Sequence, residues 1–205
     1  MSATRTFSLK HLATLRRRGL AAPRRWLASN QGRKLLATVF TLGVNLLPGF
    51  DLRTAVLRRL GFRIGHTVAL HSWLYFSEAR RNFSIGNNVT INPGCHFDNR
   101  MPIYIGDNVS ISHDVRIYTL GHDVDDPFCA VTGAPVTIHD DAWIFPNVLI
   151  MPGVTIGRGA VVYPGSVVTR NVADWNIVGG NPARFIRMRN TDVRYRIDYR
   201  VWFAR

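Results

Sequence analysis

A six-residue repeat runs through most of the chain and limits what the chain can fold into. An aliphatic residue leads each unit, a glycine or another small turn-forming residue often follows it, and a small or branched residue stands four places after it. The leading residues are Ile64, Leu70, Ile85, Ile91, Ile105, Ile111, Ile138, Ile144, Ile150, Ile156 and Val162. Neither the helical period nor the simple alternation of a strand produces this spacing.

Each six-residue unit fits one flat side of a β-coil, with its leading side chain pointing inward onto its equivalents in the neighbouring turns. Three such sides close one turn. Glycine, asparagine and aspartate in IGNN at 85–88 and IGDN at 105–108 tolerate the positive φ of tight corners. We therefore expect a mainly β chain built on a parallel β-helix.

The repeat breaks between Ile117 and Ile138, whose separation is not a multiple of six. An extruded loop over residues 119–136 must leave the coil there. The stretch YTLGHDVDDP at 118–127 opens this loop and contains His122 and three aspartates. The imidazole is a candidate for proton transfer, and the alternative is a solvated loop histidine.

Length and composition fit one domain with an appendage, because the chain has 205 residues, of which 46% are hydrophobic. Cys95 and Cys129 form neither a disulfide framework nor a metal-type pair, so we expect free thiols in a reducing, cytoplasmic setting. The apolar run over residues 35–50 is short for a membrane span and is interrupted by Pro48. We also find no secretory cleavage pattern.

The positive charge is concentrated in the first part of the chain. Residues 1–63 carry thirteen Lys or Arg against one acid, Asp51, whereas the remainder carries thirteen basic residues and twelve acids. Arginines interleaved with Leu and Trp, as at 15–18 and 23–26, favour contact with the inner face of an anionic membrane. Nucleic acid is the rival partner, but no nucleic-acid motif accompanies the charge. A solvated basic arm is the remaining alternative.

Two further segments flank the repeat. A helix over residues 51–60, capped by Asp51 and closed by Gly61, is expected to cover the first coil within an N-terminal extension of residues 1–63. In the C-terminal tail, residues 188–205, apolar and polar side chains alternate over 193–203, which predicts a strand.

The segments IGDNVSISHDVRIYTLGHDV at 105–124 and APVTIHDDAW at 134–143, with GNPAR at 180–184, resemble the hexapeptide-repeat acyltransferases. The resemblance covers residues 64–187. It points to sugar O-acetyltransferases of the galactoside, maltose and nodulation-factor type and extends to the exopolysaccharide branch, typified by colanic acid acetyltransferases. It implies a left-handed parallel β-helix, acetyl-CoA as co-substrate without a metal, and a homotrimer with active sites between neighbouring prisms.

The resemblance also places the catalytic histidine near the start of the extruded loop, where His122 stands. An imidazole there would take the proton of an acceptor hydroxyl, which then attacks the acetyl thioester. The other histidines after repeat leaders are expected to face solvent: His66, His71, His96, His113 and His139. Asp123, Asp125 and Asp126 would either orient the imidazole or be solvated.

For the acceptor, the resemblance indicates Asn92, with Asp98 and Asn99 near the expected acidic hydroxyl-binding position. An asparagine at a repeat corner is equally a normal turn residue. For coenzyme A, it indicates apolar groove walls and a cationic nucleotide end. The cofactor-binding residues so expected are Trp143, Pro146, Pro164, Thr169, Arg170, Arg184 and Arg187. Relatives usually carry Gly-Ser where this chain has Phe145 and Pro146, and proline removes a backbone donor.

We therefore predict acetyl transfer from acetyl-CoA to a hydroxyl of a sugar or a lipid-linked polysaccharide precursor. Three alternatives stay open: a zinc enzyme resembling carbonic anhydrase, an N-acetyltransferase acting on an amino sugar, and a non-catalytic scaffold. The zinc enzyme would need three convergent histidines, and no convincing triplet is present in the sequence.

Overall fold

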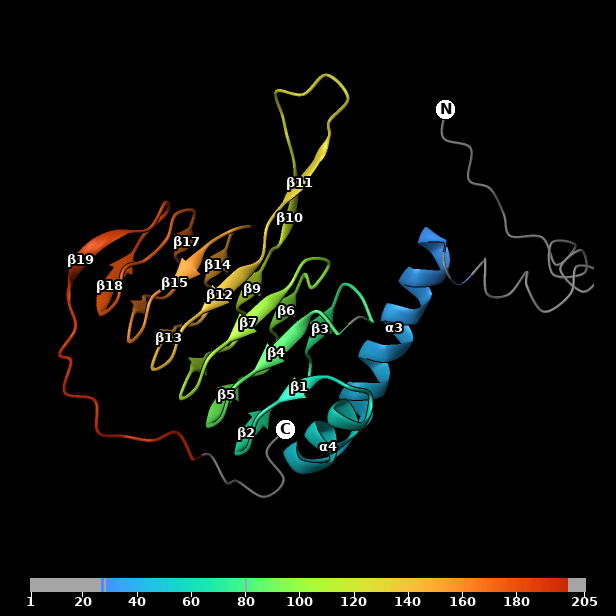
Figure 1. Cartoon of the computed structure of the whole chain (residues 1–205), viewed down its shortest axis with the longest axis horizontal. Helices are drawn as coiled ribbons and strands as arrows, with labels where there is room; N and C mark the ends of the chain where they lie inside the picture. Colours follow the sequence, from blue (N-terminus) through green and yellow to red (C-terminus); the bar gives the residue numbers. More distant parts are fainter. Residues whose placement is uncertain (1–26, 28, 80, 199–205) are drawn as a thin grey trace, which may run out of the picture.

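The computed structural model describes residue 27, residues 29–79 and residues 81–198, which form a three-sided parallel β-helix with a helical cap (Figure 1). Sheet A contains β1 (Arg63–Ile64), β4 (Phe83–Ile85), β7 (Ile103–Ile105), β12 (Val136–Ile138) and β15 (Thr155–Ile156). Sheet B contains β2 (Val68–Leu70), β5 (Val89–Ile91), β8 (Ser110–Ile111), β13 (Trp143–Ile144), β16 (Val161–Val162), β18 (Asn176–Gly179) and β19 (Arg184–Met188). Sheet C contains β3 (Tyr75–Phe76), β6 (His96–Phe97), β9 (Arg116–Ile117), β14 (Leu149–Ile150) and β17 (Val167–Val168).

The leading residues of the repeat line the core, as the pattern predicts. All of them from Leu70 onward are buried, and Ile64, in the first coil, is partly buried and packs against the core. Each strand pairs in parallel with its equivalent one turn away, as in Ile85 with Ile105 and Ile91 with Ile111. Every turn therefore adds another layer to one continuous apolar core.

The corner between sheets C and A, here the C–A corner, is longer than a repeat in the first three turns. Phe76 and Phe97 lead sheet C in the first two turns and are buried, although the sequence pattern did not identify them as leaders. Extra residues follow each of them at this corner, so the next leading residue comes more than six positions later in the sequence. The third turn has the longest insertion, and it forms the hairpin that rises from the prism (Figure 1).

Helices α3 (Asn30–Leu46) and α4 (Phe50–Arg59) cap the first turn, as expected for a lid. Asp51 lies in the first turn of α4, but it is not the N-cap. Gly49 holds that position with a φ of 70° and without a side-chain hydrogen bond, because a glycine can adopt the left-handed backbone needed to enter the helix directly after Pro48.

Side chains of the cap supply hydrogen bonds to the unpaired edge of all three sheets. Arg58 donates to the carbonyl oxygens of Ile64 and Gly65 beside sheet A, and Arg53 donates to that of Leu70 in sheet B. Thr41 accepts from the backbone nitrogen of Phe76 in sheet C (3.2 Å). These backbone groups at the exposed end of the solenoid are thus satisfied within the chain, and the cap covers the edge against further strand addition.

The opposite end folds back on itself. Strand β19 pairs antiparallel with β18, and the chain then runs back along the solenoid toward β5 (Figure 1). The strand predicted over 193–203 does not form in its described part, 193–198. Tyr195 and Ile197 instead contact the prism through Trp143 and Asn108. No strand of the described chain pairs with residues 193–198.

The arginine clusters at 15–18 and 23–26, and residues 199–203 of the predicted strand, lie outside the described residues. Within the part of the chain that the structure describes, no helix combines the length and the apolar character needed to cross a membrane.

Candidate functional site

The insertion at the C–A corner is an antiparallel hairpin of β10 (Leu120–His122) and β11 (Val131–Gly133). His122 pairs with Val131, and Leu120 pairs with Gly133. A Cβ atom on Gly133 would lie 2.3 Å from the carbonyl oxygen of Thr119, so the close approach of the two strands requires glycine there. The hairpin holds His122 on a regular element outside the coil.

The imidazole of His122 has a defined hydrogen bond. Its Nδ1 lies 2.8 Å from the carbonyl oxygen of Cys129 across the hairpin, and the side chain is exposed. A carbonyl oxygen can only accept, so Nδ1 carries the proton. In the neutral ring Nε2 is then left with its lone pair free to accept a proton from a substrate.

Two of the three aspartates after His122, Asp123 and Asp126, organise the backbone of the hairpin tip. Asp123 accepts from the backbone nitrogen of Asp125 (3.0 Å), and Asp126 accepts from that of Phe128 (2.7 Å). In the described chain, the carboxylates of Asp123 and Asp126 bond to backbone nitrogens of the hairpin tip and not to the imidazole. A backbone carbonyl, which the sequence could not indicate, orients His122 instead.

Asp98 lies at the base of the hairpin and is 1% exposed. Its carboxylate accepts two hydrogen bonds from Arg100, at 2.6 and 2.8 Å, and longer contacts from the backbone nitrogens of Thr119 and Leu120. Burial raises the pKa of Asp98, but the hydrogen bond and positive charge of Arg100, together with the two N–H groups, outweigh burial and hold the pKa below its usual range. An ionised Asp98 therefore ties the start of β10 to the coil below.

The other residues expected to bind the acceptor have structural partners. Asn99 is fully buried and exchanges two hydrogen bonds with the backbone of Glu78 one turn away. Asn92 is partly exposed at the corner between sheets B and C, the B–C corner, and donates to the carbonyl of Ile111 (3.1 Å). Asp98 and Asn99 thus lie inside the corner rather than open to an acceptor, while Asn92 keeps a partly exposed side chain.

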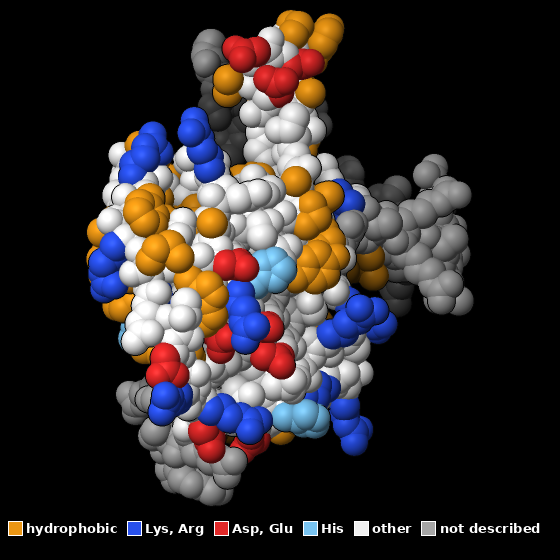
Figure 2. Space-filling model, turned by 60° about the vertical axis from the view of Figure 1, so that its left-hand side comes forward, with side chains coloured by type: hydrophobic (Ala, Val, Ile, Leu, Met, Phe, Trp, Pro, Cys, Tyr) orange, Lys and Arg blue, Asp and Glu red, His pale blue; other side chains and the backbone are white. Residues whose placement is uncertain are grey.

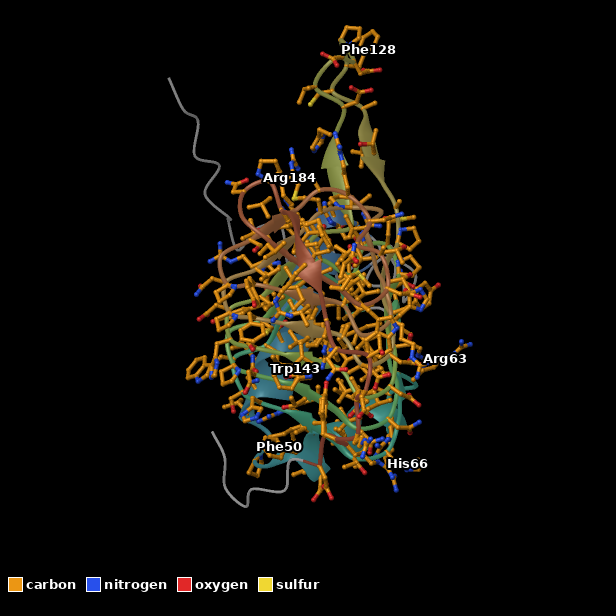
Figure 3. All side chains as sticks on the ribbon, turned by 90° about the vertical axis from the view of Figure 1, so that its left-hand side faces the viewer. Phe50, Arg63, His66, Phe128, Trp143 and Arg184 are labelled. Atoms are coloured by element: carbon orange, nitrogen blue, oxygen red, sulfur yellow. The ribbon has the colours of Figure 1, made fainter. Side chains whose placement is uncertain are left out.

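The residues expected to bind coenzyme A fall into four places in one chain. Thr169 and Arg170 are exposed at the C–A corner directly after β17, in a later turn than the hairpin. Arg184 and Arg187 are exposed on β19. Pro146 and Pro164 lie at the B–C corner. Arg184 lies on the hairpin side of the molecule, whereas Trp143 lies in the opposite half (Figure 3).

Trp143 is occupied by the C-terminal tail. Its ring packs edge-on against Tyr195 at 5.6 Å and lies 5.9 Å from the guanidinium of Arg189. Its indole nitrogen is buried and has no hydrogen-bond partner in the described chain. Within one chain, the structure does not bring Trp143 together with the exposed arginines.

Comparison with known proteins identifies the family. The family model "Bacterial transferase hexapeptide (six repeats)" matches residues 135–170. Galactoside O-acetyltransferase of Escherichia coli is 31% identical over 156 residues, which cover 74% of this chain and 76% of that protein. The crystal structure of a hexapeptide-repeat acetyltransferase of Vibrio cholerae, complexed with acetyl coenzyme A, superposes with a TM-score of 0.71 at 32% identity, covering 80% of this chain and 92% of that one.

The chain belongs to the hexapeptide-repeat acetyltransferases.

Other relatives align over different shares of their length. WcaF of E. coli, provisionally named as a colanic acid biosynthesis acetyltransferase, is 27% identical over 72% of this chain and 95% of its own. An acetyltransferase-like protein of Saccharomyces cerevisiae is 39% identical over 55% of this chain, but the match covers only 59% of that protein. The family assignment therefore rests on the relatives that are matched over most of their length.

This hexapeptide-repeat acetyltransferase also carries a row of rings on sheet C that the repeat pattern did not indicate. His96 lies between Tyr75 and Tyr118, with ring centroids 6.4 and 6.2 Å apart, and it is partly buried. Burial lowers the pKa of His96. His71, also expected to face solvent, is buried against Phe50 of the cap. Aromatic neighbours from other turns account for His96, and one from the cap accounts for His71. A repeat position alone reveals neither.

In the described residues of this acetyltransferase, no three His, Cys, Asp or Glu side chains gather closely enough to hold a metal ion. Cations that suit the phosphates of coenzyme A are present, because Arg170, Arg184 and Arg187 are exposed and form no ion pair within the described chain. The side chains available thus fit the charged end of that co-substrate.

Proposed function

We propose that the chain transfers an acetyl group from acetyl-CoA to a hydroxyl of a sugar or a lipid-linked polysaccharide precursor, with His122 as the general base. The observation that supports this role is the 2.8 Å hydrogen bond from Nδ1 to the carbonyl of Cys129. It selects the tautomer in which Nε2 is the acceptor. The hairpin also presents this nitrogen to solvent, where a substrate can reach it.

Acetyl-CoA, when bound, supplies the acetyl group and the sulfur leaving group. His122 Nε2 takes the proton of the acceptor hydroxyl as its oxygen bonds to the acetyl carbon, and the resulting imidazolium returns that proton to the departing sulfur. The carbonyl of Cys129 stabilises the imidazolium by keeping the Nδ1 proton engaged throughout. One ester bond forms, one thioester bond breaks, and the enzyme regains its starting protonation.

A saccharide acceptor is supported by the named substrate of the E. coli galactoside enzyme and by the rings on sheet C. Tyr75 and Tyr118 flank His96 on the face that connects the B–C corner to the hairpin corner. Aromatic rings offer sugars a flat apolar surface with polar edges. We assign Asn92 to contact with the acceptor, and Asp98 and Asn99 to positioning of the corner.

For coenzyme A, we assign the phosphates to Arg170, Arg184 and Arg187 beside Thr169. Pro146 and Pro164 would line the apolar groove. Figure 2 shows the acidic and apolar side chains of the hairpin tip standing above the body, with Lys and Arg side chains on the shoulder next to it. The charge of this shoulder is opposite to that of the nucleotide phosphates.

We also infer that three copies assemble, so that each hairpin completes a site on a neighbour. Val124 and Phe128 at the hairpin tip are 90% and 91% exposed, and the hairpin projects away from its own prism (Figure 3). Large apolar side chains on such a projection are typical of an interface. The free thiols of Cys95 and Cys129 are compatible with a cytoplasmic enzyme.

The test is to incubate the full chain with acetyl-CoA and a panel of sugars, amino sugars and oligosaccharides, and to measure release of coenzyme A. NMR of the product distinguishes an ester from an amide. An acetyl ester on one acceptor supports the proposal, and an amide would assign an N-acetyltransferase instead. Absence of both turnover and acetyl-CoA binding would leave a non-catalytic scaffold.

A further inference from the structure

The outward face of α3 carries a row of exposed aliphatic side chains. Leu35, Val39, Leu42 and Leu46 follow one another at intervals of three and four residues, so they lie along one side of the helix. Their exposed fractions are 49%, 58%, 57% and 81%. We call these four residues the α3 row. A contiguous exposed row of this kind marks a contact surface rather than an ordinary solvated helix face.

The orientation of α3 is fixed from its other side. Ala37 and Val44 are buried, and Val44 belongs to the main core. Asn45 donates to the carbonyl of Leu74 and accepts from its backbone nitrogen, at 2.8 and 2.9 Å. Thr41 bonds to Phe76 in the same way. The α3 row therefore points away from the solenoid, at the end opposite β19 (Figure 1).

The surroundings of the α3 row are basic. Lys34 is exposed in the first turns of the same helix, and Arg59 is exposed at the end of α4. Arg33 lies on the opposite side of α3 from the row and pairs with Glu78 at 4.0 Å. From residue 27 to residue 64 the sequence contains one acidic residue, Asp51. Aliphatic side chains bordered by cations match the layered chemistry of an anionic bilayer, with headgroup phosphates outside and acyl chains beneath.

We propose that the α3 row docks on an anionic lipid bilayer, with α3 lying in the plane of the interface. The four aliphatic side chains enter the acyl boundary, and Lys34 contacts headgroup phosphates. The helix lies on the membrane without crossing it. The docking itself does not depend on the chemistry at His122. Its use in reaching a lipid-linked acceptor rests on the proposed function.

The test is cosedimentation of the full chain with vesicles of phosphatidylcholine containing about one third phosphatidylglycerol. We expect the native chain to bind these vesicles, to bind pure phosphatidylcholine more weakly, and to lose affinity in high salt. The double variant Leu42→Ser/Leu46→Ser should lower the partition coefficient about tenfold or more. A matched control is Ile186→Ser/Met188→Ser, which removes two exposed apolar side chains from β19 and should bind like the native chain.

Three results would overturn the docking proposal. Equal binding of native chain and Leu42→Ser/Leu46→Ser would remove the α3 row from any lipid contact. A smaller particle in sedimentation velocity, with unchanged vesicle binding, would make the row an interface between copies. A lower melting temperature with unchanged vesicle binding would assign it to a contact within the chain. Acetyl transfer to a soluble sugar, measured on Leu42→Ser/Leu46→Ser, should stay at the native rate and reports on the proposed function separately.

Discussion

The Asp98 carboxylate joins the coil to the base of the hairpin that carries His122. It is buried and accepts from Arg100 and from the first backbone nitrogens of the hairpin. A second pair, Asp192 and Arg194, has the same spacing and a similar distance, 2.7 Å, but both side chains are exposed. The sequence contains five Asp-x-Arg pairs, so this spacing does not single out Asp98 and Arg100. Burial separates their structural pair from the solvated pair of Asp192 and Arg194.

Replacing Asp98 with Asn should lower the free energy of unfolding at pH 7 by about 2 kcal/mol, because a charged, buried hydrogen-bond acceptor is lost. The pKa of Asp98 is lowered in the folded chain, so folding favours the ionised form. Its stabilisation is therefore complete above about pH 5 and is lost as the pH falls through the lowered pKa. Urea unfolding at neutral and acidic pH should show the native–variant difference shrinking in acid.

Asp192→Asn is the matched control and should change stability little at either pH. A constant difference between native and Asp98→Asn across the acid range would show that the carboxylate is not the stabilising form.

At the scale of elements, the cap depends on a buried arginine. Arg53 is 2% exposed and donates to the carbonyls of Val44, Leu47 and Leu70 and to the hydroxyl of Ser72. Arg53 thus connects α3 and α4 to β2, the sheet B strand of the first turn. Burial lowers the pKa of Arg53. Because the pKa of an arginine is ordinarily very high, the side chain still stays charged at neutral pH.

Arg53→Met should lower the free energy of unfolding by about 3 kcal/mol, because it leaves several buried carbonyls without donors. Arg59→Met, on the exposed side of the same helix, serves as the control and should have little effect. Urea unfolding followed by circular dichroism measures both. Equal effects of the two changes would mean that the cap is held by apolar packing alone.

The hairpin depends on one glycine. A Cβ on Gly133 would meet backbone at Thr119, whereas one on Gly121 would meet nothing within 4 Å. Gly133→Ala should therefore displace the strands, reduce acetyl transfer at least about tenfold and increase protease cleavage of the hairpin. Gly121→Ala should leave cleavage unchanged, and a Gly133→Ala chain with native cleavage and turnover would refute the link between strand spacing and His122.

At the scale of the whole molecule, the repeat predicted the solenoid because its signal is periodic and each leader stacks on the next. Features that depend on contacts between turns were not predictable in this way. Phe76 and Phe97 were missed as leaders because long corners follow them. Arg53 reads as a surface residue by composition and is buried by the cap.

At the site, too, the sequence register predicted some features and contacts in the folded chain determined the others. His122 could be located because the loop interrupts a countable register, and its place in the hairpin agrees with that prediction. The carbonyl of Cys129, which orients His122, could not be predicted, because every residue has a backbone carbonyl and the sequence does not distinguish one from another. Asp98 and Asn99 were expected to face an acceptor, but Asp98 is paired with Arg100 in its own corner, and Asn99 is paired with Glu78 one turn away.

Assembly provides a prediction for the whole molecule. The native chain should sediment at about three times its mass of 23.1 kDa. Phe128→Ser should weaken that assembly, because a side chain 91% exposed in one chain is expected to be buried against a neighbour. Tyr104→Ser, at an exposed position on β7, is the control. A native particle of monomer mass would refute the shared site.

The role of His122 is tested most directly by comparing acetyl transfer by the native chain and by His122→Ala, with acetyl-CoA affinity measured by calorimetry on both. We expect the variant to bind acetyl-CoA with native affinity while its kcat falls by about two to four orders of magnitude, since proton removal from the hydroxyl is lost. Native turnover in the variant would contradict the assignment and leave His122 a solvated residue of the hairpin.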